Sequence, residues 1–195
     1  MAYRYFVINK PYGVLSQFTR EIPEHRTLAD LFDFPQQVYP VGRLDRDSEG
    51  LLVLTDDSSL NEQLLHPRHG HRRTYWVQVE GNPTAEDLAT LAAGPEIRIK
   101  GKVHRSRPLL VERIVPAVPR RDPPIRVRQS IPDTWLSLTL TEGKNRQVRR
   151  MCAAVGYPVL RLLRYGIGRL TLEDLKGEKV VEVSRDWLFE KLELK

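Results

Sequence analysis

Alternating apolar and polar positions predict several β-strands along the chain. Residues 3–8, 74–80 and 134–141 alternate with a period of two, residues 109–115 form a further predicted strand, and residues 51–54 form a short continuous apolar run. A period of two places successive side chains on opposite faces of a strand, whereas a short apolar run is typical of a strand buried on both faces. These five segments are therefore the predicted strands.

Four helices are predicted where apolar positions recur every three or four residues. Ser59 and Glu62 have the spacing of a capping box, and Thr84 is a favourable N-cap for a second helix. Asn145 begins a third helix, and Ser184 begins the last one. Strands that are joined mostly by turns and loops, with few helices between them, favour an α+β fold with a largely antiparallel sheet.

The domain organisation follows from length and composition. The chain has 195 residues, of which 41% are hydrophobic, so it can bury a core and form one domain or two closely packed lobes. Residues 116–132 are rich in proline and arginine, which suits a connection that becomes ordered on binding better than a sheet element. No sharp boundary is visible, and we expect a single domain over residues 1–195.

Charge and cysteine content narrow the possible partners. The formal net charge is +6, and basic residues dominate residues 98–128 and 143–172, which predicts two basic surfaces for a polyanion such as a nucleic acid. Cys152 is the single cysteine, so no intrachain disulfide can form and a reducing cytoplasm is expected. No stretch has the features of a signal peptide or a membrane span, and we expect a soluble protein.

The densest charged segment is Gly-Arg-Leu-Asp-Arg-Asp-Ser-Glu-Gly at residues 42–50, which leads directly into the apolar run. A charged loop anchored on a rigid strand is one way to present a reactive group. A solvated surface turn accounts for the same pattern equally well. The acids at Asp45, Asp47 and Glu49 also suggest a metal loop, but the interleaved arginines would repel a cation.

The histidines and the cysteine offer little chemistry. His66, His69 and His71 cluster in the sequence, yet no pattern for a fourth ligand accompanies them and arginines surround them, so we expect no metal. Cys152 falls on the apolar side of its predicted helix and is interpreted as a small core residue.

The charged loop is one of several segments that carry a family resemblance. GRLDRDSEGLLVLTDD at residues 42–57 is similar to the signature of the bacterial small-subunit-type pseudouridine synthases, a family that includes several large-subunit rRNA enzymes. Further blocks of that family stand in the expected order: KPYGVLS at 10–16, RTY at 73–75, EGKNRQVRRM at 142–151 and LLRYGIG at 162–168. Together they span nearly the whole chain.

The resemblance implies a fold and a reaction. It implies a pseudouridine synthase fold, with a mostly antiparallel mixed sheet in two halves, a central active-site cleft and flanking helices. It also implies an enzyme that flips a uridine out of RNA and rejoins the base to its ribose through carbon, without a cofactor. Family members often begin with an RNA-binding module of the S4 type. No such module precedes Lys10, so the chain most resembles the short large-subunit group, and 23S rRNA is the expected substrate, naked or within a pre-ribosomal particle.

The resemblance also assigns roles to individual residues. Asp45 matches the catalytic aspartate, which acts as a nucleophile or as a base. Burial would favour the neutral acid, so Asp45 needs a nearby cation, and Arg149 matches the family's basic residue. Tyr75 matches the tyrosine that stacks on the base, Arg43 the residue that fills the vacated space, and Leu163 an apolar residue of the uracil pocket.

Other residues are expected to support the site or contact RNA. Lys10 and Tyr12 are expected to support the loop of Asp45. Lys144 and Arg146 crowd the first turn of the third helix, where the helix dipole disfavours cations, which indicates anionic partners. Expected phosphate contacts are Lys102, Arg105, Arg107, Arg120, Arg121, Arg126, Arg128 and Arg146.

Two other functions remain open at this stage. A non-catalytic RNA-binding or ribosome-assembly protein would explain the charge but not the loop of Asp45. A nucleosidase would also break a glycosidic bond, but such enzymes usually need a second carboxylate at a defined separation. We expect the synthase to be a monomer.

Overall fold

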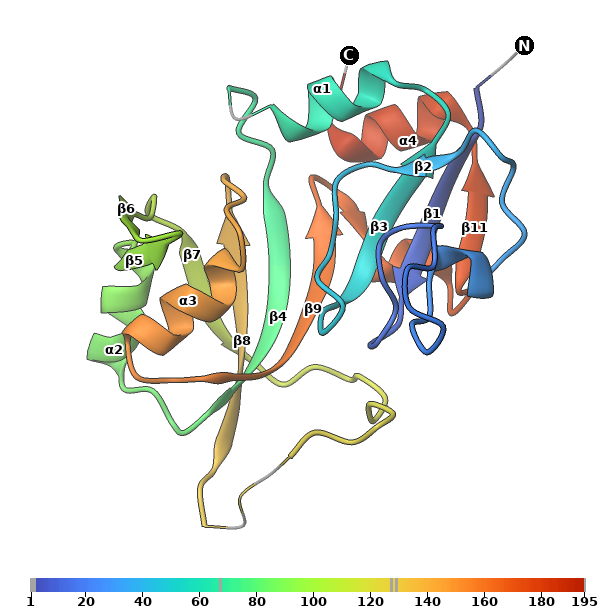
Figure 1. Cartoon of the computed structure of the whole chain (residues 1–195). Helices are drawn as coiled ribbons and strands as arrows, with labels where there is room; N and C mark the ends of the chain where they lie inside the picture. Colours follow the sequence, from blue (N-terminus) through green and yellow to red (C-terminus); the bar gives the residue numbers. More distant parts are fainter. Residues whose placement is uncertain (1–2, 67, 127, 129, 195) are drawn as a thin grey trace. The chain divides into compact units, whose positions relative to one another are not determined.

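The chain folds into two compact units. The structure is a computed structural model that describes residues 3–66, 68–126, 128 and 130–194. The first unit comprises residues 1–71 and 164–195, and the second comprises residues 72–163 (Figure 1). The strand β9 (Val159–Ile167) contributes residues to both units. The expectation of one catalytic domain concerns how the units work together and stays a prediction.

The first unit is built on antiparallel strands in the order β11-β1-β3, with the last residues of β9 beside β3. Its elements are β1 (Tyr5–Lys10), η1 (Leu28–Asp30), β2 (Tyr39–Pro40), β3 (Glu49–Thr55), α1 (Ser59–Leu65), β10 (Leu170–Thr171), η2 (Leu172–Leu175), β11 (Val180–Val183) and α4 (Arg185–Leu192). Two hydrophobic clusters cover the two faces of these strands. The unit is therefore a sheet buried between two layers.

Strand β3 is the centre of this unit, because every one of its residues is buried. Leu51 and Val53 pack into the cluster that contains α1 and α4, whereas Leu52 and Leu54 pack into the cluster of Phe6 and η1. The apolar run predicted a strand buried on both faces, and the structure confirms it. The same strand anchors the charged loop that precedes it.

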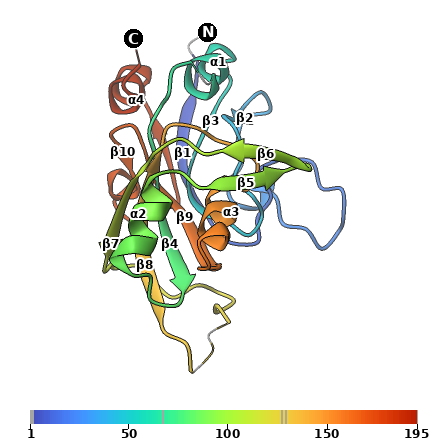
Figure 2. The ribbon, with the colours of Figure 1, turned by 90° about the vertical axis from the view of Figure 1, so that its left-hand side faces the viewer.

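The second unit has strands in the order β9-β4-β8-β7, with two helices on one face. Its elements are β4 (Arg73–Glu80), α2 (Ala85–Ala92), β5 (Glu96–Ile99), β6 (Lys102–Arg105), β7 (Leu110–Ile114), β8 (Asp133–Leu140) and α3 (Gln147–Ala154). Strand β8 pairs antiparallel with β4 and β7, and β5 pairs with β6 in a separate hairpin near α3 (Figure 2). Alternate residues of β4 and β8 form the core beneath α2 and α3.

The α+β class with a largely antiparallel sheet is confirmed, and α1 begins at Ser59 as predicted. The predicted capping box of α1 and the predicted start of the third helix were wrong. Ser59 does not form a capping box; instead its N–H and hydroxyl both donate to the carboxylate of Asp57, which satisfies the helix start from outside. The third helix begins at Gln147 rather than Asn145, because Arg146 takes a left-handed conformation. The N-caps Thr84 and Ser184 are confirmed, since each accepts a hydrogen bond from its own first turn.

The strands β5, β6, β9 and β11 were not predicted. Strand β5 alternates charged and apolar residues, whereas β6 has only one apolar residue among basic ones, so its sequence gives no clear strand pattern. Between β7 and β8, the described residues of 116–132 contain no helix or strand, as predicted for this connection. Arg121 donates to the carbonyls of Pro123 and Pro124, so it ties part of this connection to itself.

The helices are short. Across the described part of the chain, none combines the length and apolar character needed to cross a membrane.

We predict that Gly50→Ala destabilises the first unit. Gly50 has a φ of +105°, and a Cβ built there would lie 2.3 Å from the carbonyl oxygen of Arg164. Backbone strain and overpacking together should lower the free energy of unfolding by about 2–5 kcal/mol. Urea denaturation measures this change.

Gly177→Ala is the matched control, because Gly177 has a φ of +89° and open space around its Cβ position. It should cost only the backbone strain, about 1–2 kcal/mol. Equal losses in the two variants would contradict a steric limit at Gly50.

Candidate active site

The loop that carries Asp45 lies at the start of β3 in the first unit. Asp45 and Asp47 are half-buried, Arg43 and Arg46 are exposed, and Glu49 is buried. The amide of Ser48 donates to the carbonyl of Asp45 at 3.0 Å, which closes a tight turn. The alternation of exposed cations with less exposed acids explains how one short loop carries both charges.

The KPYGVLS segment packs against both sides of Asp45. The amide of Gly13 donates to the carbonyl of Arg46 at 2.8 Å. On the other side, the hydroxyl of Ser16 hydrogen-bonds the backbone of Leu44. Two segments that the resemblance treated as separate blocks are therefore one local structure.

Lys10 lies beneath this loop and is fully buried. Its Nζ donates to the carbonyl oxygens of Val14 at 2.7 Å and Pro11 at 3.0 Å. Burial lowers the pKa of Lys10 to about 8, although the nearby carboxylates of Glu49, Asp47 and Asp45 raise it. Lys10 therefore fixes the KPYGVLS turn and interacts electrostatically with the acids of the Asp45 loop.

Arg164 is a site residue that the sequence reasoning missed. It is 5% exposed, its Nε donates to the carbonyl of Leu51 at 2.7 Å, and its charge lowers the pKa of Lys10. The signal was an arginine directly after the apolar pair Leu162-Leu163, because a charge in an apolar strand is usually paired. Two cations and three acids therefore share the base of the loop.

The other candidates of the first unit lie on its surface. Arg43 is exposed, and its Nη2 donates to the amide oxygen of Gln17 at 3.1 Å. Tyr12 is half-buried in the KPYGVLS turn. The hydrogen bond to Gln17 gives Arg43 a defined direction in the absence of RNA.

In the second unit, Tyr75 lies on β4 opposite Leu138 of β8. It is half-buried and packs at the margin of the core beneath α3. Leu163 is buried in β9, at the end of this unit. Tyr75 is therefore partly a core residue and partly an accessible ring.

Helix α3 presents basic residues at its start. Lys144 and Arg146 are exposed, Arg149 is half-buried, and the first turn contains no acid. Arg146 occupies a left-handed conformation with φ of 50°, which is uncommon for a residue other than glycine or asparagine. The backbone thus places cations at the end of the helix where the dipole disfavours them.

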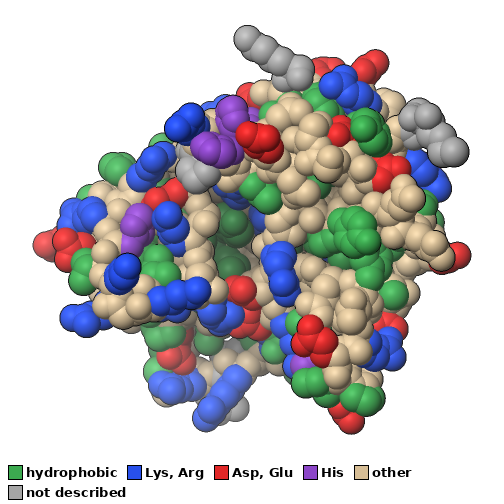
Figure 3. Space-filling model, turned by 45° about the horizontal axis from the view of Figure 1, so that its top comes forward, with side chains coloured by type: hydrophobic (Ala, Val, Ile, Leu, Met, Phe, Trp, Pro, Cys, Tyr) green, Lys and Arg blue, Asp and Glu red, His purple; other side chains and the backbone are tan. Residues whose placement is uncertain are grey.

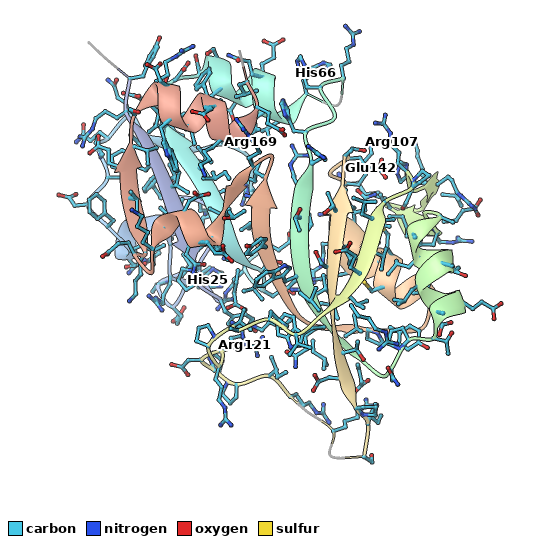
Figure 4. The ribbon with its side chains drawn as sticks, turned by 180° about the vertical axis from the view of Figure 1, so that it is seen from behind. His25, His66, Arg107, Arg121, Glu142 and Arg169 are labelled. Carbon is cyan, nitrogen blue, oxygen red and sulfur yellow. The ribbon has the colours of Figure 1, made fainter. Side chains whose placement is uncertain are left out.

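Glu142 fastens the start of α3 to the hairpin of β5 and β6. Its carboxylate accepts from the amide of Arg107 at 2.9 Å and from the side chain of Gln147, and it lies 3.2 Å from Nε2 of His104. Burial alone would raise the pKa of Glu142, but these hydrogen bonds and the charge of His104 lower it. Figure 4 shows Glu142 and Arg107 together beyond the end of β8. This carboxylate was also missed, although it directly follows the alternating strand.

The predicted phosphate contacts differ in their surroundings. Lys102, Arg105 and Arg107 are exposed on or just after the hairpin, and Arg120 and Arg126 are exposed in the connection. Figure 3 shows Lys and Arg side chains gathered over the part of the surface that holds the hairpin. Arg121 is tied to its own loop, and Arg128 lies 3.5 Å from Glu80.

The histidine cluster has no ligand geometry. The rings of His66, His69 and His71 form a row with centroids 5.8 and 5.9 Å apart. Among the residues that the structure describes, no group of three or more His, Cys, Asp or Glu side chains could hold a metal ion. Cys152 is buried, and burial raises the pKa of its thiol to about 12.

The candidate residues divide between the two units. The first holds Arg43, Asp45, Lys10, Tyr12 and Arg164, and the second holds Tyr75, Arg149, Leu163, Lys144 and Arg146. The approach of Arg149 and Tyr75 to Asp45 stays a prediction.

We predict that Lys10 gives the protein a pH-dependent stability. A lysine whose folded pKa lies near 8, below its unfolded value near 10.5, binds fewer protons in the folded state between these pH values. The free energy of unfolding should therefore rise with pH across this window. The total gain should be about 3 kcal/mol at most. In Lys10→Met, the free energy of unfolding should lack this pH-dependent gain.

The measurement compares the urea unfolding of the natural protein with that of Lys10→Met from pH 7 to 10.5. The difference should shift steadily in favour of the natural protein as pH rises, because other titrating groups cancel. A difference that does not change with pH would show that Lys10 is not held in a desolvated site.

Comparisons with known proteins identify the family of the chain. Residues 4–154 match the family model described as RNA pseudouridylate synthase. The chain is 55% identical over 172 residues to ribosomal large subunit pseudouridine synthase E of Xanthomonas axonopodis pv. citri, with 87% of this chain and 88% of the relative covered. It is 49% identical to the synthase E of Vibrio vulnificus, with 91% and 74% covered.

A solved structure supports the same assignment. A crystal structure of a pseudouridylate synthase is similar with a TM-score of 0.76 and 29% identity, and the match covers 98% of this chain and 74% of that one. The predicted pseudouridine synthase fold is thus confirmed. The chain belongs to the RNA pseudouridylate synthase family and is an isomerase that converts uridine in RNA to pseudouridine.

Proposed function

We propose that this enzyme converts one uridine of 23S rRNA to pseudouridine, with Asp45 as the catalytic carboxylate. The observation that carries the substrate is the 55% identity to a large-subunit synthase E over most of both chains. The observation that favours Asp45 is its place in a loop that is hydrogen-bonded on both sides and surrounded by buried charge. A surface turn would not need this support.

The reaction requires one bond to break and another to form at the same carbon. The bond from N1 of uracil to C1′ of the ribose breaks, the base turns, and C5 joins C1′. C5 then loses its hydrogen as a proton, and N1 gains one, so atoms and electrons balance without a cofactor. Asp45 either attacks C1′ or removes a proton from the ribose. Only an ionised carboxylate serves either role.

The remaining residues bind and orient the substrate in this proposal. Arg149 supplies the positive charge that keeps Asp45 ionised, and Tyr75 stacks on the flipped base. Leu163 lines the uracil pocket, and Arg43 fills the space that the base leaves. In this proposal, residues of both units serve one reaction.

The cellular setting completes the proposal. We infer a cytoplasmic monomer that needs neither metal nor cofactor and that meets its RNA either naked or in an assembling subunit. RNA phosphates contact Lys144, Arg146 and the basic residues of the hairpin and of the 116–132 connection. Stacking of the base offsets part of the cost of its extraction, which is a few kcal/mol.

We predict that Asp45→Asn abolishes tritium release from unmodified 23S rRNA labelled at C5 of uridine. Joining at C5 expels that hydrogen, so its release reports the reaction directly. The rate should fall at least about a thousandfold, the scale expected when a group that acts on the reacting atoms is removed. RNA binding should change little.

Asp56→Asn is the control, because Asp56 lies at the other end of β3, where its carboxylate accepts a hydrogen bond from the amide of Arg4 at 2.7 Å. It should retain full activity. If the natural protein binds this RNA yet releases no tritium, a non-catalytic binder becomes the better reading. Release of free uracil would instead indicate a nucleosidase.

We predict that Lys102→Ala and Arg105→Ala each weaken the salt dependence of RNA binding. Loss of one phosphate contact should reduce the slope of log K against log salt by about 0.7 to 0.9. Fluorescence anisotropy with an rRNA fragment at several salt concentrations measures this slope.

Arg169→Ala is the control, since Arg169 is exposed in the first unit, where it lies 3.5 Å from a carboxylate oxygen of Glu190. It should leave the slope unchanged. An unaltered slope in both hairpin variants would exclude the hairpin from the phosphate-binding surface.

A further inference from the structure

One buried hydroxyl holds the residue that precedes Asp45. The Oγ of Ser16 donates to the carbonyl of Leu44 at 2.9 Å and accepts from the amide of Leu44 at 3.1 Å. Ser16 is 3% exposed and Leu44 is 7% exposed, so water has little access to these groups. A hydroxyl can donate one hydrogen bond and accept two, and here it serves both backbone groups of one residue.

The segment that carries Ser16 is itself fixed. Lys10 binds the carbonyls of Pro11 and Val14, and the amide of Leu15 donates to the carbonyl of Arg26 at 2.9 Å. The backbone that carries Ser16 is therefore held in place on both sides.

Asp45 stands between two anchored neighbours. Ser16 holds Leu44 before it, and the amide of Gly13 holds the carbonyl of Arg46 after it. The Cα of Asp45 thus has little freedom to move along or across the loop. The anchor at Leu44 is made by one side chain, so a single substitution can remove it.

We propose that Ser16 is a positioning residue for the reaction, which sets the place of the Asp45 carboxylate through the backbone of Leu44. The inference rests on the proposed role of Asp45. Without the hydroxyl, the amide and carbonyl of Leu44 lose their partner in a buried site, and the loop must shift to satisfy them. A displacement of about 1 Å at a reacting group can slow a reaction about a hundredfold.

The chain contains a closely matched control at the other end of β3. The Oγ1 of Thr55 donates to the carbonyl of Arg4 at 2.7 Å and accepts from the amide of Asp57 at 3.0 Å, and Thr55 is 4% exposed. The pattern is the same, a buried hydroxyl that serves one carbonyl and one amide. Strand β3, which ends at Thr55, is itself about 20 Å long.

The experiment compares Ser16→Ala with Thr55→Val, which is close to threonine in shape. Single-turnover tritium release measures the chemical step, steady-state kinetics give kcat and KM, and thermal unfolding measures stability. Both variants should lose stability to a similar degree. Ser16→Ala should slow single turnover about tenfold to a hundredfold with KM within about twofold, whereas Thr55→Val should keep the natural rate.

Ser16→Cys extends the test and remains available if Ser16→Ala does not fold. A thiol is a weaker donor and acceptor than a hydroxyl, so its rate should fall between those of the natural protein and Ser16→Ala. Equal rates for Ser16→Ala and Thr55→Val, or a loss confined to KM, would overturn the positioning role. Full activity in Asp45→Asn would overturn the proposed function instead, so the two failures are distinguishable.

Discussion

The burial of one ammonium group organises the first unit. Lys10 ends β1 in a fully buried position, and a charge removed from water must find polar partners at once. It takes two carbonyls from the turn that follows, which bends the chain back toward the loop of Asp45. The acids of that loop and the buried guanidinium of Arg164 complete the balance of charge. Strand β3 then carries the loop on a support that is apolar on both faces.

In the second unit, a carboxylate joins separate segments of the chain. Glu142 is half-buried where β8 ends, and it joins the hairpin of β5 and β6 to the first turn of α3 through His104, Arg107 and Gln147. The helix that carries Arg149 is thereby fixed at its first turn, although the amides there have no acidic side chain of the helix to receive them. An ionisable side chain thus holds the candidate residues of each unit: the buried Lys10 in the first and the half-buried Glu142 in the second.

Elements with strong local sequence patterns could be predicted, and elements without them could not. Strand β3 and the N-caps of α2 and α4 could be read directly, because apolar runs and capping side chains act within a few residues. Strands β9 and β11 could not, since each owes its place to partners far away in the sequence. The cap of α1 was misread because the amide of Ser59 donates to Asp57, which lies outside the helix.

The site showed the same division between local and distant information. The family blocks indicated Asp45, Tyr75 and Arg149 as candidates, but a block cannot show which residues contact it. The double hydrogen bond of Ser16 and the contacts of Glu142 join segments far apart in the sequence. Such links become visible only when the chain has folded, because no spacing in the sequence encodes them.

The chemistry explains why such links matter in this family. The rate of a reaction that depends on side chains is sensitive to where a few groups are held. A carboxylate in a surface loop would lose reactivity to every fluctuation of that loop. Hydrogen bonds to the residues on either side of Asp45 restrict its backbone without occupying the carboxylate itself. In the proposed mechanism, the position of the Asp45 carboxylate is set through the backbone of its two neighbours.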